Sequence, residues 1–536
     1  MKFFKPTAKQ KSAATKHPDV DSELHQYLTI RQQRHWIFPR AALVGLCAGL
    51  VALAFRIALT EAEAFRDRVI AASHQHPAWQ WMVPVLFTLV GAVLSTLLVR
   101  RFAPEASGSG IPHLEAVLQR FRKLDWRRVL PVKFFGGILA IGSGLTLGRE
   151  GPTVQMGGAV GDALSRLMKV TAQERLVLIS SGAGAGLAAA FNAPLSGLVF
   201  VLEEVRRDFQ PVVFGAAFVA AVVADIVARC GTGQFPIFSV PSYATPPLTA
   251  LPAFAVLGII AGVMGVVFNR SLMKTSELYA KLPRKFALLA TAVTGGAVGL
   301  IGWFSPITIG SGHNLAESAM AGHLALAAIP LFFVARFILV STCYSTGAPG
   351  GIFAPLLVLG ALLGLAVGQI AHAIAPSMVP VPAVFAVVGM AAYFTAIVRA
   401  PLTGVMLILE MTGNYSQMLP LLISCFCAYA VGEALKDIPI YEALLQRDLE
   451  RSDDVVLLRE PTVAEFVIEE GAPFAGQDVR SLDLPAGCIL ISCAIDNRKW
   501  VPGPNTRLRA HMRITAIVAP EAFGGLELLR MGCTRE

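Results

Sequence analysis

Glu150 is the residue whose type and surroundings point most directly to chemistry. It lies in Gly148-Arg149-Glu150-Gly151-Pro152, inside the largely apolar stretch 131–202. A carboxylate at membrane depth costs at least ~2.5 kcal/mol on insertion scales and by default marks the path of an ion or a proton. The flanking glycines and the following proline predict a helix that begins here rather than one that passes through. The sequence therefore predicts an acid at a helix start inside the membrane.

The composition agrees with a membrane protein. Hydrophobic residues make up 54% of the 536 residues, and charged residues make up 15%, against about 25% in soluble domains. The net charge of +9 comes from Lys and Arg at the ends of apolar segments, such as Arg100-Arg101 and the cluster within 120–133. This positive-inside pattern argues against a nucleic acid partner and predicts a cytoplasmic N-terminus. No apolar h-region occurs in the first forty residues, so no cleavable signal peptide is expected.

Apolar segments recur from residue 41 to residue 435, and the first of them is expected to span about 41–62. Several are too short, or too interrupted by Gly and Pro, to cross a ~30 Å hydrocarbon core alone. Broken segments at membrane depth are tolerated only where they are buried in protein or line a cavity. The pattern therefore predicts an all-α polytopic membrane protein with broken and re-entrant helices.

An internal repeat predicts two related halves. Residues 193–204 match residues 400–411: both read Ala-Pro-Leu-Ser/Thr-Gly, followed by an apolar run and a glutamate. That glutamate is Glu203 in one half and Glu410 in the other, which indicates a structural role for it. Paired halves of this kind are typical of transporters, whose sites lie where the repeats meet.

The repeat also pairs the segment around Glu150 with a second helix start. Residues 148–152 fall on residues 351–355, so Glu150 corresponds to Phe353. If each half has an odd number of crossings, the two helix starts approach one point from opposite faces. Each start carries about half a positive charge and unpaired N–H groups, so such a point binds an anion. The sequence therefore predicts an anion path in which Glu150 competes with the anion.

Four ordered segments resemble the CLC family of chloride channels and chloride/proton antiporters. Gly108-Ser109-Gly110-Ile111-Pro112, residues 148–152 and Gly351-Ile352-Phe353-Ala354-Pro355 resemble its three selectivity segments, and Tyr441 resembles its inner tyrosine. The resemblance covers roughly residues 40–450. It implies a CLC-type inverted repeat and a homodimer with a separate pore in each subunit.

The resemblance also implies which groups bind chloride. The hydroxyls of Ser109 and Tyr441 would hold the central anion. The backbone N–H groups of Ile352 and Phe353 would complete that site, and the backbone from Arg149 to Gly151 would form an outer one. Uncharged donors suit a transported anion because they also release it. Taken alone, Ser109 would be a helix cap and Tyr441 an interfacial aromatic.

Two glutamates would move protons in such a protein. Glu150 would be the gate: ionised, its carboxylate fills an anion position, and protonated, it swings away and admits chloride. Glu204 resembles the internal glutamate of the antiporters, which passes protons towards the gate, and the repeat pairs it with Met411. The alternative for Glu204 is a helix-end carboxylate paired with Arg206 or Arg207.

No cofactor and no metal are expected. The eight cysteines are scattered, and the one close pair, Cys425 and Cys427, fits no zinc spacing. His113 and His313 follow Gly-rich turns and are interpreted as satisfied turn histidines. Glu115 is interpreted as a structural acid that pairs with a nearby Arg or Lys. The membrane segments contain nothing like a Ser/His pair, a His cluster or a paired Asp site, so we do not expect an enzyme.

After Glu450 the composition changes to that of a small soluble α+β domain. Short apolar runs alternate with Gly/Pro/Asp turns over 461–519. Through Gly471-Ala472-Pro473 and residues 482–485, the region resembles the C-terminal regulatory lobe of potassium-uptake systems (TrkA-C). It departs from that lobe at His511-Met512, where the lobe has Gly-Asp. The ligand is open, and a structural tail without a ligand is the alternative.

These observations predict a chloride/proton antiporter in the cell inner membrane, with both termini cytoplasmic. Chloride, protons and membrane lipid are its expected partners. The alternatives are a passive chloride channel on the same fold, an intramembrane enzyme with Glu150 as acid or base, and a regulator without transport. The expected domains are 1–37 (cytoplasmic segment), 38–450 (transmembrane domain, with halves 38–205 and 251–435), 451–460 (linker) and 461–536 (cytoplasmic TrkA-C-like domain).

Overall fold

The structure divides the chain into two compact units. It is a computed structural model that describes residues 18–75, 77–234, 236–238, 240, 243–450, 462–495, 498–519, 522 and 524–534. The helical unit comprises residues 1–118 and 124–446, and the C-terminal unit comprises residues 119–123 and 447–536. The expected linker 451–460 and the first 17 residues of the expected N-terminal segment lie outside the described residues.

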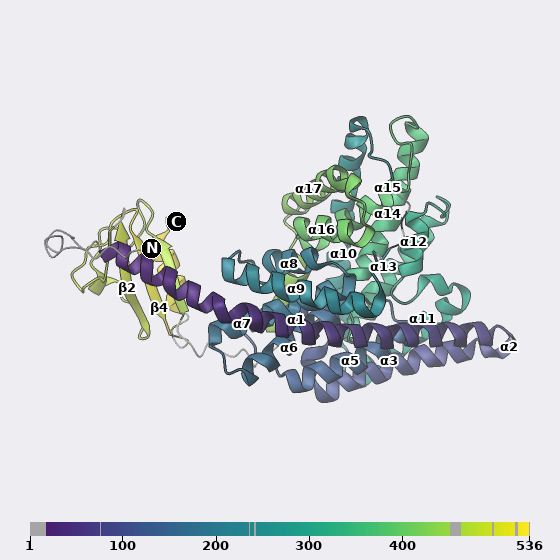
Figure 1. Cartoon of the computed structure of the whole chain (residues 1–536), viewed down its shortest axis with the longest axis horizontal. Coiled ribbons are helices and arrows are strands. Elements are labelled where there is room, and N and C mark those ends of the chain that lie inside the picture. Colours follow the sequence, from purple (N-terminus) through teal and green to yellow (C-terminus); the bar gives the residue numbers. More distant parts are fainter. Residues whose placement is uncertain are drawn as a thin grey trace, which may run out of the picture. The chain divides into compact units, whose positions relative to one another are not determined.

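The helical unit is built from long and short helices that follow the predicted apolar segments (Figure 1). Its first half contains α1 (Pro18–Ser73), α2 (Pro77–Gln80), α3 (Met82–Phe102), α4 (Ile111–Leu118), α5 (Trp126–Gly142), α6 (Glu150–Leu167), α7 (Ala172–Phe191), α8 (Pro194–Phe200), the π-helical turn η3 (Val201–Val205) and α9 (Pro211–Thr232). Its second half contains α10 (Leu251–Lys281), α11 (Arg284–Phe304), α12 (His313–Met320), α13 (Ile329–Ser345), α14 (Phe353–Ile374), α15 (Val384–Val398), α16 (Pro401–Thr412), α17 (Met418–Ala434) and the start of α18 (Ile440–Glu450).

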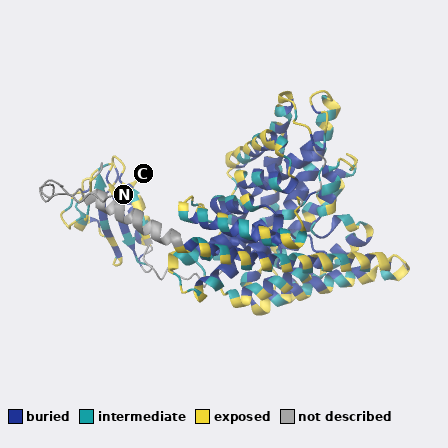
Figure 2. Cartoon of the chain, viewed as in Figure 1, coloured by how far each residue is buried: buried dark blue, intermediate teal, exposed yellow. Residues whose placement is uncertain are grey.

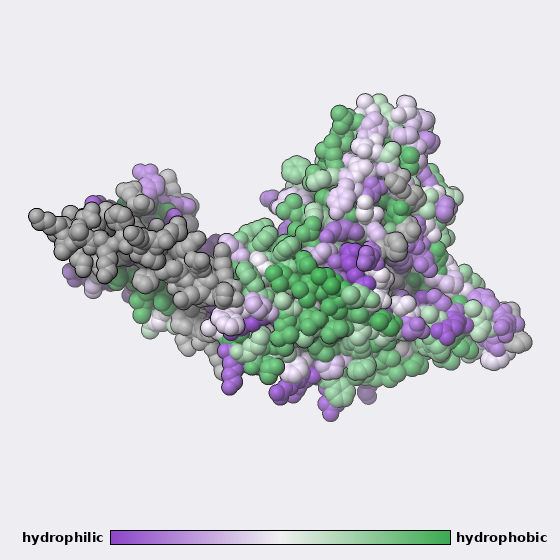
Figure 3. Space-filling model, viewed as in Figure 1, coloured by the Kyte–Doolittle hydropathy of each residue, from purple (hydrophilic) through white to green (hydrophobic). Residues whose placement is uncertain are grey.

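The helices confirm the prediction of an all-α membrane protein with broken segments. Among the described residues, seven helices are long and apolar enough to cross a membrane, and three shorter ones are also apolar. The buried residues gather where the helices pack together (Figure 2). Hydrophobic residues cover much of the unit's surface (Figure 3), as expected of a surface that faces lipid. One boundary differs: the apolar segment expected to end at residue 62 continues as a helix to Ser73.

The glycines of the two halves repeat the same close contact. A Cβ at Gly157 would collide with the carbonyl of Gly182, and a Cβ at Gly182 would collide with the carbonyl of Gly157. Gly360 and Gly389 form the same reciprocal contact in the second half. Only glycine permits helix backbones to approach this closely. Helices α14 and α15 therefore pack against each other through the same kind of glycine contact as α6 and α7, which supports two related halves.

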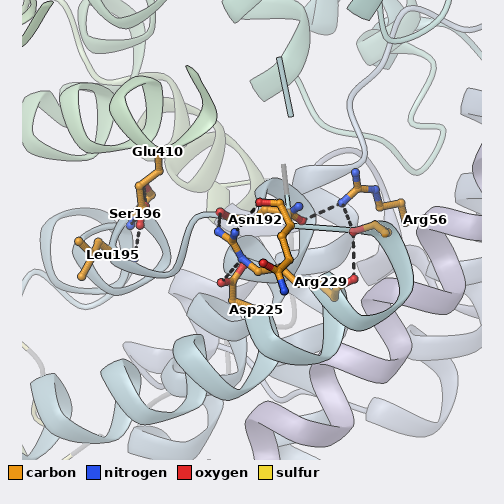
Figure 4. A network of polar contacts seen from close by, with 10 residues as sticks. Arg56, Asn192, Leu195, Ser196, Asp225, Arg229 and Glu410 are labelled. Atoms are coloured by element: carbon orange, nitrogen blue, oxygen red, sulfur yellow. Dashed lines mark hydrogen bonds and ion pairs between the residues drawn. The ribbon is translucent and has the colours of Figure 1, made fainter. Parts of the chain in front are cut away.

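Glu410 caps a helix of the other half. Helix α8 begins with Pro194 after Ala193, and an alanine side chain cannot cap the free N–H groups of a first turn. The Glu410 carboxylate accepts hydrogen bonds from the backbone N–H of Leu195 at 3.0 Å and of Ser196 at 2.7 Å (Figure 4). The Ser196 hydroxyl donates a third bond, at 2.5 Å.

Glu203 caps a helix of the second half in the same way. Helix α16 begins with Pro401 after Ala400, again without a capping side chain. The Glu203 carboxylate accepts from the N–H of Leu402 at 3.0 Å, and from the N–H and hydroxyl of Thr403, both at 2.7 Å. The predicted structural role of this glutamate in both halves is thereby confirmed. Each of the two glutamates therefore caps the helix start that precedes the other.

Glu410→Ala is expected to lower the free energy of unfolding by about 3 kcal/mol, because two helix N–H groups and a hydroxyl lose a charged acceptor. Unfolding of the detergent-solubilised protein would measure it. Glu61→Ala is the control, since Glu61 is exposed and lies 3.8 Å from an equally exposed Arg68; a change of at most about 0.5 kcal/mol is expected there. Equal losses in the two variants would contradict the cap.

The C-terminal unit confirms the predicted α+β fold. Its strands are β1 (Thr462–Val467), β2 (Cys488–Ile495), β3 (Arg498–Trp500) and β4 (Arg513–Val518), and its helix is α19 (Gly524–Cys533). The strands form one antiparallel sheet in the order β1-β4-β2-β3. His511, where the sequence departs from the TrkA-C pattern, adopts a φ of 64° just before β4. Glycine adopts this left-handed conformation most easily, which accounts for the glycine expected there.

The Cys533 thiol is expected to react slowly in the folded protein. Burial raises the pKa of Cys533 to about 11, and the thiolate is the reactive form. At pH 8 only about 0.1% of this thiol is ionised, so its alkylation rate should rise about tenfold per pH unit from pH 8 to pH 10. Mass spectrometry of the iodoacetamide-labelled peptide gives the rate, with urea-unfolded protein as the control. A rate that levels off near pH 9 in the folded protein would contradict this assignment.

Candidate functional site

The two predicted helix starts meet at one point. Helix α6 begins at Glu150 and helix α14 begins at Phe353. Just before them, the N–H of Gly148 donates to the carbonyl of Gly351 at 2.6 Å, and the N–H of Gly351 donates to the carbonyl of Gly148 at 2.7 Å. This reciprocal bridge confirms that the two segments approach each other across the repeat.

The segment that carries Ser109 joins the same point. The N–H of Gly350 donates to the carbonyl of Gly108 at 2.9 Å. The same segment also packs closely against residues 148–152, since a Cβ at Gly151 would lie only 2.8 Å from the Ser109 carbonyl oxygen. All three segments that resembled selectivity segments are therefore in contact.

A buried lysine fixes the approach to Ser109. Lys133, on α5, is fully buried, and its ammonium group donates to the carbonyls of Ala106 at 3.0 Å and of Gly108 at 2.7 Å. Gly108 and Gly110 both have positive φ, 57° and 82°, which suits glycine on either side of Ser109. The sequence pattern placed Lys133 in the basic cluster at the end of an apolar segment, and this interpretation is wrong for Lys133, because its side chain is fully buried and bonds backbone carbonyls.

Two buried hydroxyls lie in this region. The Ser109 oxygen accepts from the N–H of Ile111 at 3.1 Å, so Ser109 does cap α4, and its hydroxyl proton can still be donated elsewhere. Tyr441 is fully buried, and its hydroxyl has no hydrogen-bond partner among the described residues. A buried hydroxyl without a partner is rare in proteins.

Glu150 occupies the start of the opposite helix. It is 2% exposed. Its Oε2 accepts from the N–H of Ala354 at 3.3 Å, in the first turn of α14, and its Oε1 lies 4.0 Å from the Nε of Arg149. Ile352, which lies directly before α14, is fully buried and forms the N-cap of that helix. The Glu150 carboxylate thus lies where a helix start favours a negative charge.

A polar cavity of about 570 Å³ adjoins Glu150. Its charged or titratable lining residues are Arg56, Glu63, Arg66, Asp67, Arg149, Glu150 and His313. Arg56 is held in its wall by hydrogen bonds to the side chains of Asn192 at 2.9 Å and Thr232 at 3.3 Å (Figure 4). The cavity lining beside Glu150 therefore carries both signs of charge.

Sequence analysis missed this cavity, although a signal was present. Arg56, Thr60, Glu63 and Asp67 follow one another at spacings of four, three and four residues, which places them on one face of α1. The face was overlooked because the apolar segment was expected to end at residue 62. All four residues line the cavity.

Glu204 lies in a second group of charges. It sits on η3 and is 3% exposed, as is Glu115 on α4. Arg207 lies 3.8 Å from Glu204 and 3.2 Å from Glu442, and the charges of Glu204 and Arg207 both act on Glu115. The ion pair considered for Glu204 therefore exists, but at a distance too long for a hydrogen bond. Glu115 itself forms no ion pair with an Arg or Lys among the described residues, and its Oε1 is buried without a hydrogen-bond partner there, so the pairing expected for Glu115 is not observed.

The two histidines interpreted as turn histidines have partners. The His113 ring lies 3.3 Å from the amide nitrogen of Gln155. His313 lies 3.4 Å from Glu317 and stacks on Phe238 with a centroid distance of 4.8 Å. Among the described residues, no group of three His, Cys, Asp or Glu side chains could hold a metal ion.

Family models match both units. The model described as voltage gated chloride channel matches residues 91–433, and the TrkA-C domain model matches residues 463–527. The H(+)/Cl(-) exchange transporter ClcA of Vibrio parahaemolyticus is 42% identical over 415 residues, which cover 76% of this chain and 89% of that protein. The protein of the same name from Salmonella paratyphi A is 40% identical over 420 residues, covering 77% and 89%.

Solved structures agree with these matches. A slow cyanobacterial Cl⁻/H⁺ antiporter superposes with a TM-score of 0.75 at 38% identity, over 78% of this chain and 99% of its own. A CLC-type fluoride/proton antiporter shares the fold, with a TM-score of 0.65 at 22% identity, over 76% and 97%. The match to the family model and the identity to its members lead to one conclusion: this chain belongs to the voltage-gated chloride channel (CLC) family and carries a C-terminal TrkA-C domain.

Proposed function

We propose that this protein exchanges chloride for protons across the membrane. The observation that carries the proposal is the Glu150 carboxylate, which accepts the N–H of Ala354 at the point where α6 and α14 begin. A protonatable group in an anion position can link the movement of protons to that of anions. The relatives named as H(+)/Cl(-) exchange transporters support exchange over a passive channel.

Chloride binds at two positions in this proposal. The hydroxyls of Ser109 and Tyr441 hold the central ion, together with the N–H groups of Ile352 and Phe353. The buried hydroxyl of Tyr441, which lacks a protein partner among the described residues, supports this assignment because an anion would satisfy it. The backbone from Arg149 to Gly151 forms the outer position. These donors carry no full charge, so they release the ion as well as bind it.

Glu150 acts as the gate. While it is ionised, its carboxylate takes the place of an anion at the start of α14, next to Ala354. When it takes up a proton, it loses the charge that the helix start attracts and leaves the position to chloride. The polar cavity on which it borders supplies protons from one side.

Glu204 supplies protons from the cytoplasmic side. It lies among Glu115, Arg207 and Glu442, where several carboxylates share one arginine. Glu204 and Glu442 both approach Arg207, and in this proposal Glu204 alone carries the transferable proton. In the proposed path the proton passes Tyr441, whose hydroxyl is buried without a partner among the described residues.

The proposal includes the assembly and placement of the chain. A homodimer with one pore per subunit lies in the inner membrane, in contact with lipid, with residues 1–37 and 461–536 in the cytoplasm. Residues 38–450 form the transport domain, with halves at about 38–205 and 251–435, and residues 451–460 link it to the TrkA-C domain, whose ligand is open. The basic residues at the ends of the apolar segments support this orientation.

Flux in liposomes tests the proposal. Liposomes that contain purified protein and high chloride are diluted into low chloride, with a potassium ionophore to remove the electrical potential. Chloride efflux is expected to draw protons inward, so the external pH rises. Chloride efflux without any pH change would favour the passive channel, and the absence of all ion flux would revive the regulator.

A further inference from the structure

A groove that the proposed transport does not use runs between α3 and α5. Its volume is about 730 Å³, and its apolar lining includes Leu98 and Phe102 from α3, and Phe135 and Leu139 from α5. Three of these side chains are strongly exposed: Phe102 by 55%, Phe135 by 61% and Leu139 by 37%. In a helix pair of a membrane protein, such an open apolar channel faces acyl chains.

One end of the groove is cationic. Arg101 lies in the last turn of α3, and Arg127 and Arg128 lie in the first turn of α5; all three line the groove. Arg128 pairs with the exposed Asp125 at 3.3 Å. Neither Arg101 nor Arg127 forms an ion pair with any of the described residues. Their guanidinium groups lie beside aromatic rings, 5.7 Å from the Phe102 centroid and 5.5 Å from that of Trp126.

We propose that this groove binds one anionic phospholipid. The phosphate lies on Arg101 and Arg127, and an acyl chain follows the groove along Leu98, Phe135 and Leu139. Guanidinium groups bind phosphate through charge-assisted, often bidentate, hydrogen bonds. Basic pockets between membrane helices are a recurrent recognition site for anionic headgroups. Three arginines against one carboxylate favour an anionic headgroup over a zwitterionic one.

Such a lipid would tie α5 to α3 close to the proposed chloride site. Lys133 follows the groove residue Val132 on α5 and holds the carbonyls of Ala106 and Gly108, directly before Ser109. A lipid that restricts the motion of α5 therefore also restricts the backbone from Ala106 to Ser109. The binding itself does not depend on the transport that we propose.

Native mass spectrometry of the full chain in detergent, titrated with phosphatidylglycerol or phosphatidylcholine, tests the proposal. Wild-type protein is expected to bind one phosphatidylglycerol at least about tenfold more tightly than phosphatidylcholine. Arg101→Gln/Arg127→Gln should reduce that preference to about twofold or less. Lys281→Gln/Lys285→Gln removes the same charge from exposed positions at the end of α10 and the start of α11, and should retain the preference.

A second variant tests the groove without changing any charge. Leu139→Trp fills part of the apolar channel and is expected to weaken phosphatidylglycerol binding by about tenfold or more. Equal affinity of wild-type protein for the two lipids would overturn the proposal. So would an equal loss in the two double variants, or unchanged binding by Leu139→Trp, because either result would indicate non-specific attraction to basic residues.

Discussion

Glu150→Ala is expected to keep chloride moving while abolishing its coupling to protons. The variant has no carboxylate to occupy the start of α14 and no group there to carry a proton. Chloride should therefore pass at about the wild-type rate or faster, while chloride-driven proton uptake falls by at least about a hundredfold. Simultaneous chloride and pH electrodes on the liposomes described above would record both.

Two further variants make this result specific. Glu150→Gln keeps the shape of the side chain without its charge and should be uncoupled as well. Glu63→Gln is the matched control, because Glu63 lines the same polar cavity but does not contact the start of α14. It should retain coupling. If Glu150→Ala still pumped protons, or if Glu63→Gln lost coupling equally, the gate assignment would be wrong.

The meeting of α6 and α14 could be predicted because two kinds of local information agreed. Gly and Pro around Glu150 indicated a helix start, and the repeat then pointed to a second start at Phe353. The structure adds what spacing cannot express, namely the bridge between Gly148 and Gly351. The residues that start a helix are a local property of the sequence. The contact between two helix starts depends instead on how the two halves fold together.

The group around Glu204 was only partly predictable for the same reason. The sequence places Arg207 one helical turn from Glu204, and that pair was considered. Glu115 and Glu442 lie far away along the chain, and only packing of α4, η3 and α18 brings them near. Nor did any local signal show that the capping glutamate Glu410 bonds to a helix in the other half.

The cavity beside Glu150 shows a different limit. Its polar residues follow helical spacing along α1, so the information was present in the sequence. A segment boundary placed at residue 62 hid it, because average hydropathy falls where polar residues line a cavity inside a helix. Helix length and the polarity of one face are separate properties, so a polar face can continue a helix beyond the end of its apolar segment.

Glu204→Gln is expected to lower proton uptake much more than chloride flux, while leaving the gate carboxylate of Glu150 in place. The amide keeps the volume of the side chain but carries no transferable proton, so proton uptake should fall by at least about tenfold. Chloride flux should remain within about threefold of wild type, because Glu204 is not among the groups proposed to bind chloride. The same paired electrodes measure both fluxes.

Glu115→Gln is the control for Glu204→Gln, since Glu115 is buried to the same 3% exposure and belongs to the same group of charges. It removes a neighbouring charge without removing the proposed proton carrier, so most of the proton uptake should survive. A parallel loss of chloride and proton flux in Glu204→Gln would instead mean that the residue supports the fold through Arg207. Unchanged proton uptake would mean that protons reach Glu150 by another path. Because Glu150→Ala removes coupling while retaining chloride flux, and Glu204→Gln removes proton supply while leaving the gate in place, the two results together distinguish an antiporter with two proton-carrying acids from a channel that contains the same residues.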